Sequence, residues 1–74
     1  MKVTVKLFAT LRNGRFDREV RQYPAGTTVK QVMGELNITK DQAAIIFVNN
    51  QHAMTNQELF DGDVLAFFPP IGGG

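Results

Sequence analysis

Residues 61–70 read Asp61-Gly62-Asp63-Val64-Leu65-Ala66-Phe67-Phe68-Pro69-Pro70, a turn followed by a strand and a strand stop. Asp-Gly-Asp is typical of a tight turn, because glycine and aspartate tolerate turn conformations. The apolar run 64–68 predicts the last strand of the chain. Pro69 ends that strand, since proline has no N–H to donate to a sheet ladder. Strand side chains alternate between faces, so either Phe67 or Phe68 is expected on the outside.

The rest of the chain supplies further strands. Polar and apolar residues alternate near the start, which predicts a half-buried strand with Val3, Val5 and Leu7 inward. Asn13-Gly14 predicts the turn of a hairpin, because both residues tolerate positive φ. The run 43–48 is rich in β-branched residues and is interpreted as a buried strand. The expected strands are 2–8, 16–23, 43–48, 52–54 and 64–68.

One helix is expected between the second and third strands. Thr28 can cap it, and Gln31 three residues later completes a capping box. Gly34 inside the helix costs about 1 kcal/mol relative to alanine, which suggests close packing of the helix on the sheet. Asn37 is the expected end. Apolar residues recur at the spacing of a one-sided helical stripe at Val29, Val32, Met33 and Leu36.

This order of elements indicates an α+β domain rather than an alternating α/β fold, because one helix serves one mixed sheet. The helix is expected to lie across one face, with the first and last strands adjacent and parallel. The domain is expected to span 1–70, and 71–74 to form a flexible glycine tail. A chain of this length buries only about 60% of its unfolded surface, so its core is thin.

Composition argues against several classes of function. The formal net charge of +1 gives no strong basic signal for nucleic acid. Most bases lie in the first half and most acids in the second, which indicates either a solvated surface whose halves attract one another or a bipolar surface that orients a partner. There is no cysteine, hence no disulfide, thiolate metal site or thiol chemistry. We find neither a signal peptide nor an apolar run of membrane length, and therefore expect a cytoplasmic protein with no membrane partner.

A conventional active site is not evident. His52, the single histidine, has no cysteine or spaced carboxylates around it to form a metal site and is expected to be structural or merely exposed. Asp61 and Asp63 are interpreted as turn formers rather than a catalytic pair. No glycine-rich phosphate loop is present, and a chain this small has little room for a pocket. We expect a protein that is not itself an enzyme and that binds no metal or cofactor.

The end of the chain offers different chemistry. Pro69 and Pro70 set a stiff, extended exit from the domain, and three glycines follow. Glycine has no side chain, so this backbone can pass through a narrow channel. Extended residues span about 3.3 Å each, enough to carry the terminal carboxylate roughly 15–20 Å into another protein's active site. That carboxylate is the candidate reactive group; the alternative is a frayed, functionless tail.

The turn 61–63, the strand 64–68, the two prolines and the terminal glycines resemble the C-terminal signature of the MoaD/ThiS family of ubiquitin-like sulfur carrier proteins. Residues 5–12 also resemble the small subunit of molybdopterin synthase. The resemblance implies the β-grasp, ubiquitin-like fold, with a mixed sheet of four to five strands and one helix across one face. It also implies a monomer when free.

The resemblance implies a mechanism. A partner of the ubiquitin-activating type uses Mg-ATP to adenylate the terminal carboxylate, and a sulfur donor displaces AMP to leave a thiocarboxylate. Gly74 would carry the reacting carboxylate and Gly73 would give it clearance. The large subunit of a sulfur-accepting synthase would receive the sulfur. The implied role is that of a carrier in the biosynthesis of molybdopterin or tungstopterin cofactor.

Partner contacts are expected beside the tail. Phe8 falls on the polar face of the first strand, and the resemblance favours Phe68 as the outward phenylalanine of the last, so the two predict an exposed apolar patch. Arg12 would add charge at its rim. The alternative is that Phe8 lies under a loop. The predicted partner-binding residues are Phe8, Arg12, Phe68, Pro69, Pro70, Ile71 and Gly72.

Other functions stay open. A ubiquitin-like modifier joined to other proteins through its terminal glycine needs the same activation, and a pure interaction domain would have an inert tail. Among carriers, the Phe-Phe-Pro-Pro ending favours the molybdenum or tungsten branch. The chain is short for that branch around 37–44, so thiamine synthesis, tRNA thiolation and cysteine synthesis remain alternatives.

Overall fold

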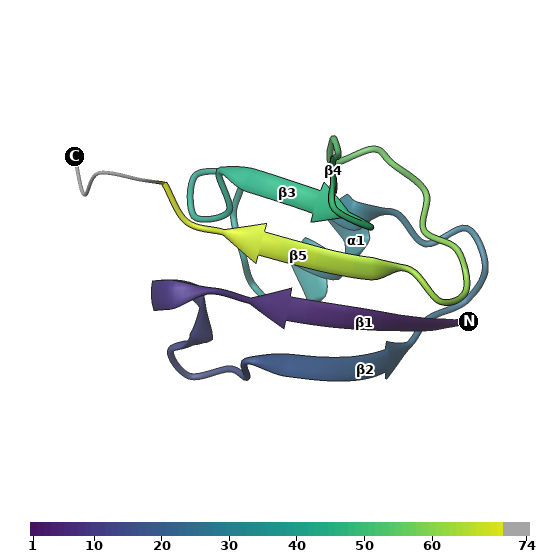
Figure 1. Ribbon diagram of the computed structural model, residues 1–74, viewed down its shortest axis with the longest axis horizontal. Coiled ribbons are helices and arrows are strands. Elements are labelled where there is room, and N and C mark those ends of the chain that lie inside the picture. Colours follow the sequence, from purple (N-terminus) through teal and green to yellow (C-terminus); the bar gives the residue numbers. More distant parts are fainter. Residues whose placement is uncertain (71–74) are drawn as a thin grey trace.

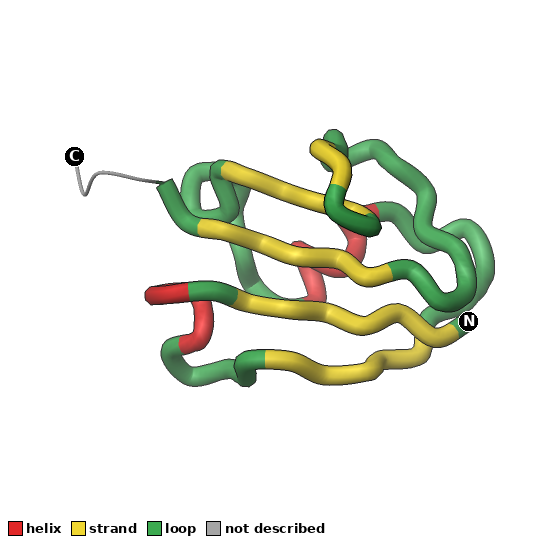
Figure 2. Tube along the Cα trace, in the orientation of Figure 1, coloured by secondary structure: helices red, strands yellow, loops and turns green. Residues whose placement is uncertain are grey.

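The structure, a computed structural model, describes residues 1–70 as a five-stranded sheet with one α-helix lying across one of its faces (Figures 1 and 2). Within this range no helix is long and apolar enough to cross a membrane. The segment 71–74, predicted as a flexible tail, lies outside the described residues. The elements in chain order are β1 (Lys2–Leu7), the 3₁₀ helix η1 (Ala9–Arg12), β2 (Arg18–Gln22), α1 (Val29–Glu35), β3 (Ile45–Val48), β4 (Gln51–His52) and β5 (Val64–Phe68).

The sheet order is β2-β1-β5-β3-β4. The first and last strands, β1 and β5, are adjacent and parallel, with Leu7 opposite Phe67. All other neighbouring pairs are antiparallel. The predicted α+β architecture, including the parallel pairing of the terminal strands, is therefore confirmed. Because β1 and β5 run in the same direction, their carboxyl ends meet at one edge of the sheet (Figure 1).

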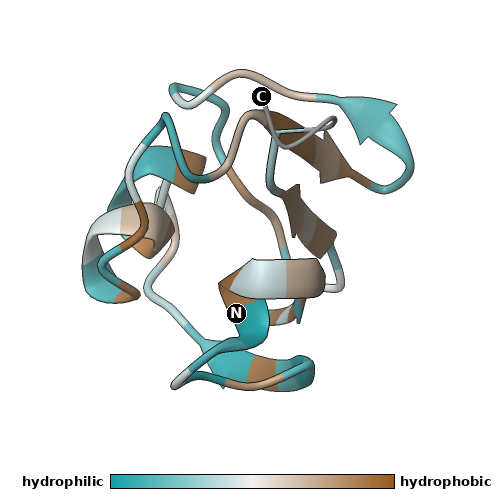
Figure 3. Cartoon of the chain, turned by 90° about the vertical axis from the view of Figure 1, so that its left-hand side faces the viewer, coloured by the Kyte–Doolittle hydropathy of each residue, from teal (hydrophilic) through white to brown (hydrophobic). Residues whose placement is uncertain are grey.

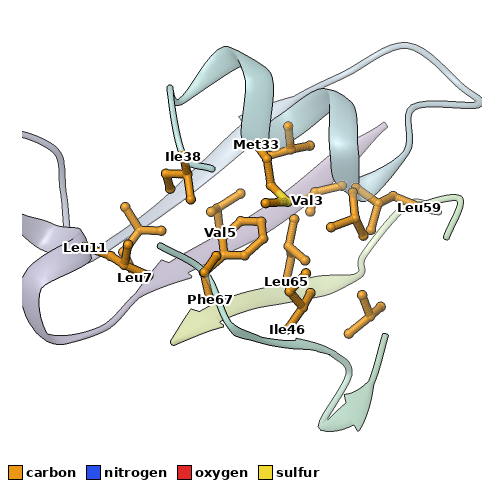
Figure 4. Packing of buried hydrophobic residues seen from close by; sticks show 14 of the residues in the cluster. Val3, Val5, Leu7, Leu11, Met33, Ile38, Ile46, Leu59, Leu65 and Phe67 are labelled. Atoms are coloured by element: carbon orange, nitrogen blue, oxygen red, sulfur yellow. The ribbon is translucent and has the colours of Figure 1, made fainter. Parts of the chain in front are cut away.

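The core lies between α1 and the sheet (Figure 4). Val3, Val5 and Leu7 are fully buried, as the alternation of β1 predicts. On β5, Phe67 is fully buried, and Phe68 is left half-buried on the opposite face. Full burial of such a side chain contributes about 1.5–3 kcal/mol, so a one-residue slip of either strand would expose the core.

Helix α1 begins as predicted. Thr28 accepts a hydrogen bond from the backbone N–H of Gln31 at 3.4 Å, and the Gln31 side chain accepts one from the N–H of Thr28 at 2.8 Å. The predicted close packing of Gly34 on the sheet is wrong. Gly34 is exposed, and a Cβ built on it meets no atom within 4 Å. The helix instead packs through its larger side chains Val29, Val32 and Met33.

β1 and β2 pair antiparallel, as the predicted hairpin requires, but the connection between them contains an element that was not predicted. The 3₁₀ helix η1 lies in it, and β2 begins at Arg18, two residues later than expected. Leu11 on η1 is only 3% exposed, so its burial draws the connection onto the core. Arg15 fixes the segment from the other side, donating hydrogen bonds to the carbonyls of Leu36 and Asn37, both at 3.0 Å. The carbonyl groups at the C-terminal end of a helix have no partner within the helix, and Arg15 supplies donors at the end of α1.

A polar network joins the end of β2 to α1. The Tyr23 hydroxyl donates a hydrogen bond to Glu35 Oε1 at 2.8 Å and accepts one from Arg21 Nε at 3.0 Å. Arg21 also forms an ion pair with Glu35 at 3.2 Å. Burial and the hydrogen bond to Glu35 raise the pKa of Tyr23 to about 12, since both disfavour the tyrosinate.

Replacing Gly34 with alanine should stabilise the protein. The new methyl group meets open space, and alanine is favoured over glycine in a helix by about 1 kcal/mol. For a domain of this size the melting temperature should rise by about 4–8 °C, measured by circular dichroism. Gly26→Ala is the control and should destabilise, because Gly26 has φ of +89°. A lower melting temperature for Gly34→Ala would contradict the described environment.

The Tyr23 network predicts a stability change at high pH. The folded pKa lies above that of a free tyrosine, so its contribution is present below pH 10 and is lost as pH rises toward 12. One proton gives a slope of at most about 1.4 kcal/mol per pH unit. Urea unfolding between pH 9 and 12 should show a shallower decline for Tyr23→Phe than for the native protein. If the unfolding free energies of both proteins fall equally steeply with pH, Tyr23 is not the cause of the decline.

Candidate functional site

Two aromatic rings meet where β1 and β5 end. Phe8 follows β1, Phe68 ends β5, and their rings stack with centroids 4.2 Å apart and planes 7° from parallel. The cause is the parallel register, which sets Leu7 opposite Phe67 and so brings the next residue of each strand to the same place. Phe8 and Phe68 are both half-buried. The sequence prediction paired these two residues, and the structure brings them together.

Two further rings extend this contact across the sheet. Phe47 of β3 meets the Phe68 ring edge-on, with centroids 5.5 Å apart, and the His52 ring of β4 lies 4.5 Å from that of Phe47. Phe47 lies opposite Ala66 in the antiparallel register, which makes Phe68 its diagonal neighbour. We call Phe8, Phe68, Phe47 and His52 the aromatic row. It lies on the sheet face opposite α1, whereas Phe67 and Ile46 point into the core.

Sequence reasoning missed Phe47 and left His52 without a role. The run 43–48 was interpreted as a buried strand, but in β3 only alternate residues are buried, and Ile45 and Phe47 are half-buried. The observed strand is also shorter, Ile45–Val48, and the return strand is Gln51–His52 rather than 52–54. The predicted two-layer fold could have placed Phe47. One helix covers only one face of the sheet, so alternate residues of this strand had to lie on the uncovered face.

Arg12 lies at the rim of the row, as predicted. Its Nε donates a hydrogen bond to the Leu7 carbonyl at 2.7 Å, and its guanidinium carbon lies 5.4 Å from the centre of the Phe8 ring. Nε is also 3.5 Å from a carboxylate oxygen of Asp17. These contacts hold the cation against an aromatic face, where it is attracted to the ring electrons. Arg12 therefore adds fixed positive charge beside Phe8.

The same sheet face becomes basic toward β2. Lys2 and Lys6 alternate with the buried residues of β1, and Lys6 lies opposite Arg18 of β2. The half formed by β3 and β5 carries apolar side chains instead. Figure 3 looks onto the end of the molecule where β1 and β5 finish, and there β3 and β5 are largely apolar (brown), whereas β2 and β4 are mostly hydrophilic (teal). The face thus combines an aromatic half with a cationic half.

The described chain leaves the sheet directly beside the row. Pro69, half-buried, and Pro70, exposed, follow Phe68. The other predicted tail residues lie outside the described residues; they are Ile71, Gly72, Gly73 and Gly74.

The acidic turn is structural. Asp61 Oδ1 accepts a hydrogen bond from the N–H of Lys2 at 2.7 Å, and Asp63 Oδ2 accepts one from the N–H of Phe60 at 2.8 Å. Gly62 between them has φ of +87°. The Asp63 carboxylate therefore stabilises the turn itself, as predicted, whereas the Asp61 carboxylate ties the turn to the start of β1. Within residues 1–70 no three metal-ligating side chains come together.

A family model described as the ThiS family matches residues 5–74. The chain belongs to the ThiS family. A putative molybdopterin converting factor, subunit 1, from Pyrococcus furiosus is 30% identical to this ThiS-family chain, with 96% of this chain and 99% of that one covered and a TM-score of 0.75. The predicted membership of the MoaD/ThiS family is therefore confirmed. No curated protein sequence matches significantly.

Two more distant structures share the ubiquitin-like β-grasp fold of this ThiS-family chain. SAMP1 from Haloferax volcanii is 22% identical over the full length of both chains, with a TM-score of 0.75. A protein–protein complex of subunits 1 and 2 of molybdopterin-converting factor from Helicobacter pylori contains a chain that is 22% identical over both full lengths, with a TM-score of 0.67. The family and fold are those of a sulfur carrier or a ubiquitin-like protein, and members of this family are small carrier subunits rather than catalysts.

Proposed function

We propose that this protein is a sulfur carrier whose C-terminal carboxylate, on Gly74, is adenylated by a partner enzyme and then converted to a thiocarboxylate. The observation that carries the proposal is the aromatic row, because it lies where β5 leads into Pro69 and Pro70. The family match supports it, since the match runs through the terminal glycines to residue 74. A partner that binds the aromatic row therefore has the start of the C-terminal segment, at Pro69, in a fixed position on its own surface.

The proposed chemistry suits a glycine terminus. A free carboxylate is a poor electrophile, because it has no good leaving group. Its oxygen attacks the α-phosphorus of Mg-ATP, forming an acyl adenylate and releasing pyrophosphate. A donor of sulfide-level sulfur (HS⁻) then attacks the carbonyl carbon, AMP leaves with the electrons of the C–O bond, and loss of the S–H proton gives the thiocarboxylate. Without a side chain, Gly73 can enter a closed cleft that positions the carboxylate and excludes water.

The adenylating partner, of the ubiquitin-activating type, would bind the aromatic row with an apolar patch. Aromatic residues are enriched at the energetic centres of interfaces. The cationic half of the face, with Lys6, Arg18 and Arg12, favours a partner with carboxylates beside that patch. The row and its basic neighbours thus suit a surface that is apolar at its centre and acidic on one side.

The sulfur acceptor is proposed from the relatives. The Pyrococcus furiosus protein is named as subunit 1 of molybdopterin converting factor, and the Helicobacter pylori structure is a complex of subunits 1 and 2. We therefore propose a synthase large subunit as the acceptor, and molybdopterin or tungstopterin cofactor as the product. Sulfur delivery for thiamine, tRNA thiolation or cysteine synthesis would use the same carrier chemistry with another acceptor.

A second candidate is a ubiquitin-like modifier joined to other proteins through Gly74. It is favoured by the likeness to SAMP1 and to small archaeal modifier protein 1 of Haloferax volcanii. Activation is the same in both functions, and only the product differs: a thiocarboxylate on the free protein, or an isopeptide with a lysine of another protein.

Mass spectrometry separates these functions. After incubation with an adenylating enzyme, Mg-ATP and a sulfur donor, a carrier should gain the mass difference between sulfur and oxygen, located on Gly74. A modifier should instead appear as isopeptide adducts on other proteins. A chain lacking Gly73 and Gly74 is the control and should gain nothing. If that shortened chain supports every function of the native protein, the tail is inert and the carrier hypothesis is wrong.

The docking surface is tested by Phe8→Asp. The charge replaces a ring stacked on Phe68, so binding of the adenylating enzyme should weaken by about 2 kcal/mol, or roughly 30-fold in Kd, measured by calorimetry. Phe60→Asp is the matched control. Phe60 is 62% exposed and lies in the turn preceding β5, at the opposite end of the sheet. Equal loss in both variants would contradict the assigned surface, as would a Phe8→Asp protein that fails to fold.

A further inference from the structure

A pocket of ≈ 340 Å³ opens on the helix side of the protein, formed by α1, the segment that follows it and the loop after β4. Helix α1 covers one face of the sheet (Figure 1), and the aromatic row lies on the other face. The pocket, lined by residues of α1, is therefore separate from the proposed docking surface. Its lining residues are Lys30, Met33, Gly34, Ile38, Lys40 and Thr55.

The floor of the pocket is apolar. Met33 and Ile38 belong to the core and are each only 4% exposed, so they present their edges to the pocket. The N–H of Ile38 donates a hydrogen bond to the Met33 carbonyl at 2.9 Å, which holds the two residues together after the helix has ended. A ligand group that reaches this floor therefore contacts the hydrophobic core directly.

Gly34 accounts for the opening. Glycine weakens a helix relative to alanine, and a helical glycine is usually explained by its backbone angle or by a close neighbour. Neither applies, because Gly34 does not have a positive φ and no atom lies within 4 Å of a Cβ placed there. Gly34 is one of the residues that line the pocket, so a side chain at position 34 would stand in that lining. The glycine keeps the pocket open at a cost in helix stability.

The rim is cationic. Lys30 from α1 and Lys40 from the following segment both line the pocket, and none of the six lining residues is acidic. The ion pairs within residues 1–70 are all made by arginines, so both ammonium groups are unpaired in that part of the chain. Thr55 adds a hydroxyl, and its carbonyl accepts a hydrogen bond from the N–H of Lys30 at 2.8 Å, which ties the two sides together.

We propose that this helix-side pocket binds an acidic peptide segment of a partner protein, which inserts one apolar side chain onto Met33 and Ile38 and pairs its carboxylates with Lys30 and Lys40. A simple anion would make no contact with the apolar floor. A purely apolar ligand would leave the two ammonium groups at the rim without a negatively charged partner. A peptide with an apolar residue between carboxylates satisfies both. Because the site lies across the core from the aromatic row, such a partner binds while the row is occupied.

The probe for this proposal is a short fluorescent peptide with one leucine between flanking glutamates, titrated against the intact protein by fluorescence anisotropy. Gly34→Leu should abolish binding, because the new side chain fills the pocket while favouring the helix. Lys30→Glu combined with Lys40→Glu should weaken binding by about tenfold. Lys2→Glu, a charge change on the opposite face, should leave the affinity unchanged. A peptide with serine in place of leucine should bind more weakly.

Several results would overturn the proposal: no binding to the native protein, equal binding to Gly34→Leu, or equal binding of the leucine and serine peptides. Binding that is lost in Phe8→Asp and retained in Gly34→Leu would place the peptide on the aromatic row instead. Thermal unfolding establishes that Gly34→Leu is folded. Thiocarboxylate formation should be unaffected in Gly34→Leu, so this proposal and the sulfur-carrier function fail or hold separately.

Discussion

Parallel hydrogen bonding between β1 and β5 at the centre of the sheet fixes the position of the other elements. Parallel strands cannot be joined by a tight hairpin, so the chain between them must cross over one face, and α1 makes part of that crossing. One face is thereby covered and the other stays open. The same pairing brings the two carboxyl ends together, which is why residues sixty positions apart, Phe8 and Phe68, stack on one another.

Local patterns predicted the parts of the fold that depend on neighbouring residues. The alternation in β1, the capping box at Thr28 and the turn at Asp61–Asp63 were all correct, because each is decided by hydrogen bonds or burial within a few positions. The 3₁₀ helix η1 was not predicted. Asn13-Gly14 is a strong turn signal, but the burial of Leu11 against the core decides the path of that connection.

The candidate site was predicted in part for the same reason. Phe8 could be assigned because the start of the chain has a clear period of two, and Phe68 because the family resemblance indicated which phenylalanine faces outward. Phe47 could not, since a run of β-branched residues does not show which of its faces is covered. Gly34 was assigned to close packing because a helical glycine usually has that cause, and only the three-dimensional neighbourhood shows that its environment is open.

The net charge is only +1, but most acidic side chains are paired within residues 1–70 and the lysines are not. Five of the seven side-chain carboxylates form ion pairs or accept backbone hydrogen bonds within residues 1–70: Asp17, Glu19, Glu35, Asp61 and Asp63. These ion pairs all join residues within the first half of the chain, so they do not link the basic first half to the acidic second half. Lysines make none of these pairs. Positive charge therefore remains available on both the sheet face, at Lys6, and the helix face, at Lys30. Since a small core leaves little distance between these faces, each can attract an acidic surface while the chain as a whole stays nearly neutral.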